Sequence, residues 1–247
     1  MKFFKEILGR IFALWAMLWF VITMFIVFIP IWAAGLWPEP KRTKIFHSIS
    51  RGWMFFFFFI TGMRLRVKGK EAFKKGERYI VACNHNALID VPVSTPFIPV
   101  NKTIAKIEMS RIPLFGMIYK RGAVLVDRKN EESRKASYGK MKEVLELGIH
   151  MCIYPEGTRN KTNEPLQPFH NGAFRLAKDT GFSILPAVIF NSAKVLPKNK
   201  KFYFWPVKIE LHFLSPISPA SQTMEQLKEK IFNQIKDHYV EHTKITD

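Results

Sequence analysis

The stretch RYIVACNHNALIDVP, residues 78–92, decides the fold, because it joins a buried strand to the start of a helix. Its first half is apolar and β-branched, which is typical of a strand inside a covered sheet. Neither a continuous helix nor a continuous strand places His85 and Asp90 on one face. A strand that ends near Asn84 and enters a helix at Leu88 can fold Asp90 back beneath His85. We therefore predict a strand-to-helix junction, where α/β folds hold their ligands.

His85 and Asp90 make chemical sense as a pair. A carboxylate bonded to one ring nitrogen fixes the tautomer of the imidazole and leaves the other nitrogen as a general base. A second interpretation is purely structural: a hydrogen-bonded histidine, and an aspartate that complements the dipole at a helix N-terminus. A lone H-x4-D pattern leaves both interpretations open.

Strand and helix patterns alternate along the rest of the chain. Besides 78–83, strands are predicted at 103–107, 123–127, 150–154, 184–190 and 208–214. Helices are predicted at 131–147, at 171–181 with Gly181 as its C-terminal cap, and after Ser221 as an N-cap. This order predicts an α/β fold with a mixed, mostly parallel sheet flanked by helices.

The N-terminal region indicates a membrane-embedded segment. Ile11 to Pro38 carries no charged side chain, and about 20 apolar residues suffice to span the hydrocarbon core. A second apolar patch, Gly52–Met63, is too short to span as a straight helix. Either the first segment crosses alone, or both form a helical hairpin in one leaflet. Basic residues at both outer ends favour the hairpin: Lys2, Lys5, Arg10, Arg64 and Arg66. We predict a membrane-embedding segment over 1–66 and an α/β domain over 67–247.

The charge balance predicts an anionic partner. Lys and Arg total 38 against 20 Asp and Glu, a formal net charge of +18. Beside a membrane segment, the mixture of lysines and aromatics over 196–208 favours an interfacial belt that reaches anionic lipids, and not a nucleic-acid surface.

The two cysteines, Cys83 and Cys152, do not suggest a disulfide framework. We see no zinc-type spacing among Cys and His, and expect no metal. The histidines at 47, 150, 212, 238 and 242 are interpreted as surface or packing residues.

A second motif, YPEGTRN at 154–160, follows a predicted strand. Glycine allows a close backbone approach, and Thr158 and Arg159 add a hydroxyl and a guanidinium fork, a set suited to a phosphate. An ordinary turn with a solvated arginine is the alternative. Lys106 and Arg128, near the ends of two other predicted strands, are further candidates for binding an anionic group.

Taken in order, these motifs resemble the four blocks of the glycerolipid acyltransferases, most closely the bacterial 1-acylglycerol-3-phosphate acyltransferases. The resemblance covers about residues 75–190. The matching blocks are His85-x4-Asp90, Gly122-x4-Asp127-Arg128, Pro155-Glu156-Gly157-Thr158-Arg159 and Leu185-Pro186-Ala187. The N-terminal apolar pair is similar to the family's membrane-docking two-helix motif.

The resemblance implies a glycerolphosphate acyltransferase-like fold and a mechanism. His85 would remove the proton from a glycerol hydroxyl, Asp90 would orient His85, and the hydroxyl oxygen would attack the thioester directly. The acceptor phosphate would be held by Arg159, with Glu156 and Gly157 shaping the loop. Thr158, Lys106 and Arg128 are the additional substrate-binding candidates. The acceptor would be lyso-phosphatidic acid, and the product phosphatidic acid. No cofactor is implied, since acyl-CoA or acyl-carrier protein enters as a substrate. The expected location is the cytoplasmic face of a bacterial inner membrane.

The sequence departs from the family pattern at three positions: Ala87, Asn160 and His170 stand where serine, serine and lysine are common. They leave open another lyso-lipid acceptor, such as a lysophospholipid or a lyso-amino lipid. A non-catalytic lipid-binding protein would carry a degraded His–Asp pair, and here the pair is intact. Cys83 lies close to His85 in sequence, but we interpret it as a packing residue and not as a nucleophile.

Overall fold

The computed structural model describes the backbone from Lys2 to Thr246 and the side chains of residues 3–243. Met1 and Asp247, the outer ends of the two predicted segments, lie outside the described residues, as does the Lys2 side chain. The strands are β1 (Arg64–Lys68), β2 (Tyr79–Cys83), β3 (Asn101–Lys106), β4 (Ala123–Val126), β5 (His150–Ile153), β6 (Ser183–Phe190) and β7 (Lys208–Phe213). The α-helices are α1 (Lys2–Ala33), α2 (Lys41–Ile60), α3 (Asp90–Ser94), α4 (Phe115–Gly122), α5 (Glu131–Glu146), α6 (Gly172–Thr180), α7 (Ser192–Val195) and α8 (Met224–Thr246). Short 3-10 helices cover Ala34–Leu36, Lys70–Ala72 and Ile107–Arg111.

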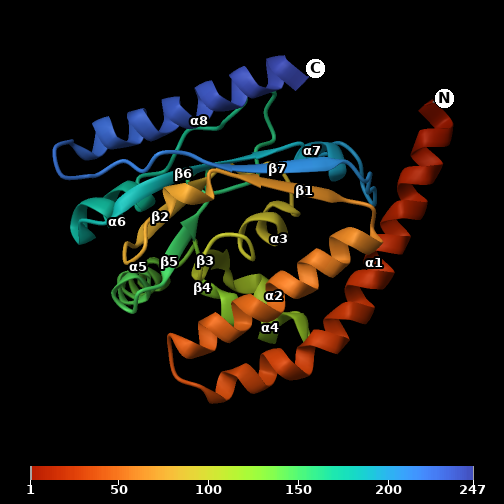
Figure 1. The fold of residues 1–247 in the computed structure, drawn as a ribbon, viewed down its shortest axis with the longest axis horizontal. Helices are drawn as coiled ribbons and strands as arrows, with labels where there is room; N and C mark the ends of the chain where they lie inside the picture. The colour runs from red at the N-terminus through yellow and green to blue at the C-terminus, as the bar shows by residue number, and fades with distance from the viewer. Residues whose placement is uncertain (1, 247) are drawn as a thin grey trace.

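The strands form one sheet in the order β1-β7-β6-β2-β5-β3-β4 (Figure 1). Five neighbouring strands, from β6 to β4, run parallel to one another. Strand β7 pairs antiparallel with β6 and parallel with β1. The predicted mixed, mostly parallel sheet is confirmed. Because the carboxyl ends of the five parallel strands meet at one edge, the motifs that follow β2, β3, β4 and β5 all emerge there.

All six predicted strands are present, within a few residues at each end. Strand β1 was missed, because the alternating basic and apolar residues of Arg64–Lys68 were taken for the flank of the preceding apolar patch. Strand β1 runs across residue 66, the predicted boundary between the membrane-embedding segment and the α/β domain. This boundary therefore stays a prediction. The predicted cap of α8 was wrong. Thr223 caps this helix instead of Ser221: its hydroxyl accepts the Gln226 N–H at 3.2 Å, and the Gln226 side chain accepts the Thr223 N–H at 2.8 Å.

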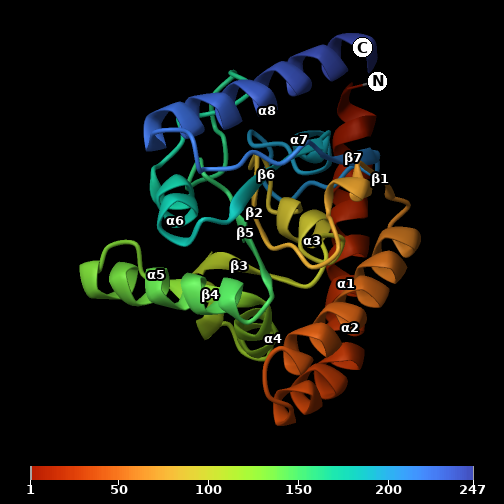
Figure 2. The same cartoon turned by 60° about the vertical axis from the view of Figure 1, so that its left-hand side comes forward.

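Helices α1 and α2 form an antiparallel hairpin (Figures 1 and 2). Near the middle the Trp53 indole donates to Thr23 Oγ1 at 2.8 Å, and near the open end the Trp15 indole donates to the Ile60 carbonyl at 3.1 Å. Among the described residues, one helix is long and apolar enough to cross a membrane, over Phe3–Leu36. Much of its apolar surface faces outward, away from the sheet.

The core has two layers, one on each face of the sheet. Val81 and Cys83 of β2 point to the face covered by the α1–α2 hairpin and α3. Ile80 and Ala82 point to the opposite face, covered by α5, α6 and α8. Figure 2 shows α8 and the hairpin on opposite sides of the sheet. The alternation follows from the two-residue period of a strand.

Candidate active site

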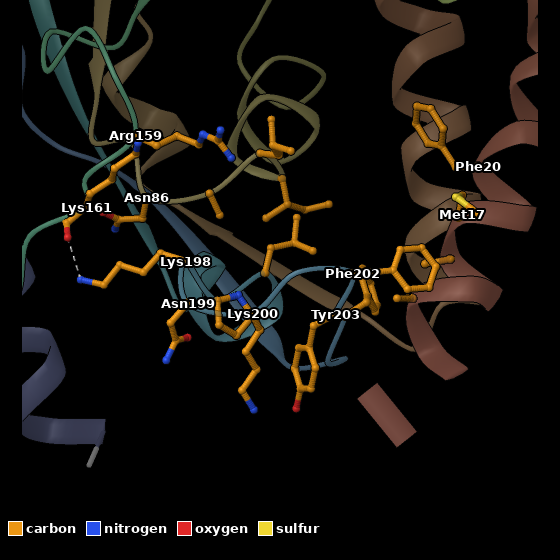
Figure 3. Close-up of a pocket in the computed structure, with 18 of the residues that line it drawn as sticks. Met17, Phe20, Asn86, Arg159, Lys161, Lys198, Asn199, Lys200, Phe202 and Tyr203 are labelled. Carbon is orange, nitrogen blue, oxygen red and sulfur yellow. Dashed lines mark hydrogen bonds between the residues drawn. The ribbon is translucent and has the colours of Figure 1, made fainter. Parts of the chain in front are cut away.

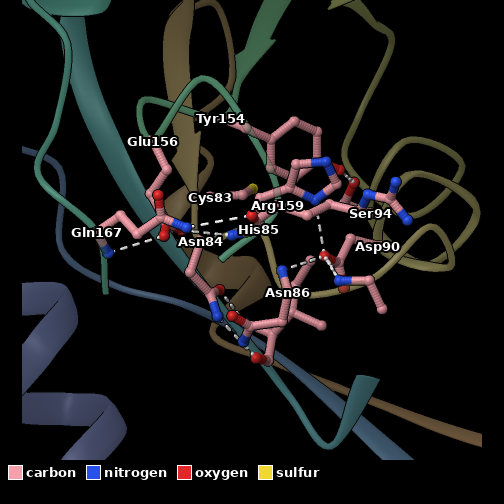
Figure 4. Close-up of polar contacts among 12 residues, drawn as sticks. Cys83, Asn84, His85, Asn86, Asp90, Ser94, Tyr154, Glu156, Arg159 and Gln167 are labelled. Atoms are coloured by element: carbon pink, nitrogen blue, oxygen red, sulfur yellow. Dashed lines mark hydrogen bonds and ion pairs between the residues drawn. The ribbon is translucent and has the colours of Figure 1, made fainter. Parts of the chain in front are cut away.

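His85 and Asp90 are brought together as the junction requires (Figure 4). Strand β2 ends at Cys83, α3 begins at Asp90, and the intervening turn places His85 Nδ1 2.8 Å from Asp90 Oδ2. A carboxylate only accepts hydrogen bonds, so Nδ1 carries the proton and Nε2 keeps its lone pair. The imidazole is thereby held in the tautomer that serves a general base.

The Asp90 carboxylate is fully buried but well supported. Its Oδ2 also accepts the backbone N–H groups of Asn86 at 2.6 Å and Ala87 at 2.7 Å. All three hydrogen bonds converge on one oxygen, and Oδ1 has no partner among the described residues. One atom therefore holds both the imidazole and the turn that carries it.

Glu156 connects the second motif to the first. It is buried, and its two oxygens accept the backbone N–H of His85 at 2.7 Å and of Gln167 at 2.9 Å. The Asn160 N–H donates to the His85 carbonyl at 2.6 Å, a second link between the two loops. Burial raises the pKa of Glu156 to about 7, with the nearby Asp90 charge acting in the same direction. Glu156 thus positions His85 through the backbone.

The raised pKa of Glu156 predicts a pH-dependent stability. Its folded pKa of about 7 lies above the ordinary 4.5, so the stabilisation is present below pH 4.5 and is lost as pH rises towards 7. Relative to Glu156→Gln, the wild-type free energy of unfolding should fall by about 2 kcal/mol between pH 5 and 7.5. Guanidinium denaturation of both proteins in detergent at the two pH values measures this. A wild-type advantage that grows with pH would contradict the assignment.

The imidazole of His85 rests on an aromatic platform. The Tyr154 ring stacks on it with a centroid distance of 4.4 Å, and the buried Tyr154 hydroxyl lies 2.7 Å from Ser94 Oγ.

Cys83 is fully buried beside Cys152, with 4.0 Å between the sulfur atoms, and both thiols are free. The hydrogen bond to Cys152, together with burial, raises the pKa of the Cys83 thiol. A buried neutral thiol fits packing and not nucleophilic attack.

A cavity of about 880 Å³ lies next to the turn between His85 and Asp90 (Figure 3): residues 86–89 line it, whereas His85 and Asp90 themselves do not. One wall is apolar and comes from the hairpin: Ala13, Ala16, Met17, Phe20 and Phe57. The opposite wall comes from the turn at 86–89, from 159–161 and from the segment 196–204, and it carries Arg159, Lys161, Lys198 and Lys200. An apolar wall facing a basic one suits an amphipathic anion.

The predicted phosphate-binding residues divide into two groups. Arg159 lines the cavity, the adjacent Thr158 is exposed but does not line it, and Gly157 makes the turn with φ of +70°. A side chain at Gly157 would collide with the His170 ring, 2.6 Å from the position of a Cβ. Lys106, the last residue of β3, and Arg128, just after β4, lie at the same sheet edge, but neither lines the cavity.

Sequence reasoning missed several contributors. Asn84 braces the junction: its amide exchanges two hydrogen bonds with the Ile189 backbone, at 2.7 and 3.0 Å. A buried asparagine at a strand end was the available signal. Tyr154 gave no signal beyond its place as the first residue of the second motif. The segment 196–208 was interpreted as an interfacial belt, and its part 196–204 forms a wall of the cavity. Within the phenylalanine run, Phe57 and Phe58 are buried, while Phe55, Phe56 and Phe59 are exposed.

Together, the doubly covered sheet and the His–Asp pair at its carboxyl edge define an α/β enzyme equipped to activate a hydroxyl beside a lipid-sized cavity. A family model described as Acyltransferase matches residues 64–190. The chain belongs to this acyltransferase family and is an enzyme of that class.

Individual relatives agree with the family model. The 1-acyl-sn-glycerol-3-phosphate acyltransferase of Helicobacter pylori is 32% identical over 190 residues, which cover 75% of this chain and 78% of the relative. The enzyme of the same name from Cocos nucifera is 33% identical, covering 74% of this chain and 56% of the relative. The crystal structure of the 1-acyl-sn-glycerophosphate (LPA) acyltransferase PlsC from Thermotoga maritima has a TM-score of 0.83 at 22% identity, covering 96% of this chain and 97% of that chain. The fold predicted from the motifs is therefore confirmed.

Proposed function

We propose that this acyltransferase moves a fatty acyl chain from a thioester to the sn-2 hydroxyl of 1-acylglycerol-3-phosphate, forming phosphatidic acid for phospholipid biosynthesis. The observation that carries the proposal is the 2.8 Å contact between His85 Nδ1 and Asp90 Oδ2 beside a cavity that Arg159 lines. The names of the relatives support the choice of acceptor.

The chemistry follows from the geometry. Nε2 of His85 takes the proton of the acceptor hydroxyl as its oxygen bonds to the thioester carbonyl carbon. The Asp90 carboxylate stabilises the imidazolium that forms. The tetrahedral intermediate collapses with cleavage of the carbon–sulfur bond, and the imidazolium returns its proton to the departing thiolate. The protein's own residues hold and move every proton, so we propose no cofactor; acyl-CoA or acyl-carrier protein is a substrate.

The amphipathic cavity matches the acceptor. The apolar wall from α1 and α2 would take the acyl chain, and Arg159 would take the phosphate through charge-assisted hydrogen bonds. Thr158 and Gly157 offer the hydroxyl and the exposed backbone of the turn. Lys106 and Arg128, outside the cavity, are proposed to attract the anionic substrates to this edge of the sheet.

The hairpin suits a lipid surface. Phe3 is 79% exposed, Ile29 70% and Phe59 77%, and large apolar side chains are rarely left together in water. We propose that the hairpin is embedded in the cytoplasmic leaflet of a bacterial inner membrane, that the basic surface contacts anionic lipids, and that nucleic acid is not a partner.

A substrate panel tests the proposal. Purified enzyme is incubated with lyso-phosphatidic acid, a zwitterionic lysophospholipid and a lyso-amino lipid, each with acyl-CoA and with acyl-carrier protein, and the products are separated by mass spectrometry. Phosphatidic acid should be the main product. If only another lyso-lipid gives a product, that lyso-lipid is the acceptor in place of lyso-phosphatidic acid. Such a result would agree with the departures from the family pattern at Ala87, Asn160 and His170.

Replacement of the cavity arginine should act on binding. Arg159→Ala is expected to raise the KM for lyso-phosphatidic acid by about 10–100-fold, with a smaller change in kcat, because a charged hydrogen-bond partner of the phosphate is lost. Arg175→Ala is the control, since Arg175 is exposed on α6 and does not line the cavity. Steady-state kinetics on mixed micelles measure both variants. Equal KM values for the two would exclude Arg159 from the phosphate site.

A further inference from the structure

Strand β7 and helix α8 bring together Glu210, His212, His238 and His242, hereafter the β7–α8 cluster. Glu210 and His212 are two residues apart on β7, so both face α8, while Ile209 and Leu211 face the hairpin. His238 and His242 are four apart on α8, so they share one face of the helix. The cluster therefore lies on the opposite face of the sheet from the cavity, and the acyl-transfer chemistry does not use it.

The distances within the cluster are short. Glu210 Oε2 lies 2.9 Å from His212 Nε2 and 3.5 Å from His242 Nε2. One ligand atom from each of these three residues lies within 4.8 Å of the others. His212 Nδ1 lies 2.9 Å from His238 Nε2. Glu210 and His212 are buried, and the Phe190 ring packs against His212 and His242 with centroid distances of 4.9 and 4.3 Å.

This spacing fits a tetrahedral metal ion. With metal–ligand bonds of about 2.0–2.2 Å, two ligand atoms of a tetrahedral zinc site lie roughly 3.3 Å apart. The separations of 2.9 and 3.5 Å from Glu210 lie on either side of that value. Two imidazoles and one carboxylate also form a ligand set that zinc accepts with a fourth position open to water.

His238 is placed to support His212 as a ligand. His212 Nδ1 and His238 Nε2 face each other across 2.9 Å. A metal-bound imidazole donates its other N–H to an acceptor. His238 Nε2 is placed to accept from His212 Nδ1 after a change of tautomer in both rings.

In this structure two lysines form ion pairs with Glu210. Lys68 Nζ lies 3.3 Å from Oε2, and Lys208 Nζ lies 2.5 Å from Oε1. Their side chains are 40% and 48% exposed, so both can turn into solvent when a cation neutralises the carboxylate. Lys208 contacts the oxygen that would not bind the ion, and only Lys68 needs to withdraw.

We propose that the β7–α8 cluster binds one Zn²⁺ through Glu210 Oε2, His212 Nε2 and His242 Nε2, with His238 positioning His212. The ion joins the C-terminal part of α8 to β7.

The test uses full-length protein in detergent, stripped of metal with a chelator. Titration with Co²⁺ should give one equivalent of bound ion with the visible absorption of tetrahedral cobalt, and Zn²⁺ should displace it. His212→Gln and His242→Ala should each weaken binding more than 100-fold, and His238→Gln by about 10–100-fold. His170→Gln, an exposed histidine outside the cluster, is the matched control and should bind as wild type.

Circular dichroism of each variant checks that it is folded. His242 lies near the end of α8, so its replacement is not expected to disturb the core even if that of His212 does. Absence of saturable Co²⁺ and Zn²⁺ binding to the wild type would overturn the proposal. So would wild-type affinity in the folded His242→Ala protein, because the ion would then sit elsewhere. Neither result depends on acyl transfer.

Discussion

His85→Ala is expected to lower kcat by about 10²–10⁴-fold while leaving the KM for both substrates within a few-fold of wild type. The substitution removes the imidazole that Asp90 orients, so the acceptor hydroxyl must lose its proton to water. Binding should persist, because the apolar wall and Arg159 of the cavity do not depend on the imidazole. Release of free thiol from acyl-CoA in the presence of lyso-phosphatidic acid measures the rate.

The result for His85→Ala separates an enzyme from a lipid-binding protein. A folded variant that transfers acyl chains at the wild-type rate would show that His85 is not the base. Added imidazole offers a positive control: partial recovery of the rate at rising imidazole concentration would show that a missing base, and not a collapsed loop, is the defect.

Asp90→Ala and Asp90→Asn should differ sharply in stability. All three donors converge on Oδ2 while Oδ1 has no partner among the described residues. An asparagine can therefore place its carbonyl oxygen at the Oδ2 position and keep all three hydrogen bonds. Alanine leaves two buried backbone N–H groups and the imidazole without an acceptor. We expect Asp90→Ala to lose about 3 kcal/mol or more of stability, and Asp90→Asn much less.

The same two variants separate the catalytic effect of the Asp90 charge from the effect of the hydrogen bonds that orient His85. Asp90→Asn should keep the tautomer of His85 but lose the carboxylate that stabilises the imidazolium, which lowers kcat by about 10–100-fold. Asp90→Ala loses orientation as well and should lower kcat by about 10³-fold. Guanidinium denaturation and initial rates of the two purified variants test both expectations. Equal losses of stability in the two variants would contradict the convergence of the hydrogen bonds on one oxygen.

Patterns within short stretches of the sequence were enough to predict most of the fold. The apolar run before Cys83, the polar switch at Asn84 and the five-residue separation of His85 and Asp90 predicted a strand-to-helix junction, and the structure has one. The order of motifs placed Glu156 and Arg159 at the same sheet edge. Strand β1 was missed, because a short basic edge strand has no signal apart from the β7 strand with which it pairs.

The long-range contacts could not be predicted in the same way. Glu156 was assigned to the shape of its own loop, but its carboxylate holds the backbone of His85, 71 residues away. The β7–α8 cluster joins residues from a strand and a distant helix, so no Cys and His spacing revealed it. The segment 196–204 was interpreted from composition alone, whereas the packing of α1 against it makes it a cavity wall.

The sequence by itself determined most of the elements, the junction that pairs His85 with Asp90, and the family to which the chain belongs, because each depends on residues close together along the chain or on motifs in order. Only the tertiary structure decided which distant groups come together: Glu156 with the His85 backbone, Arg159 across the cavity from the apolar wall of the hairpin, and Glu210 with His212 and His242. The physical reason is that a hydrogen bond or a metal site requires atoms within a few ångströms, and the packing of distant segments sets those distances.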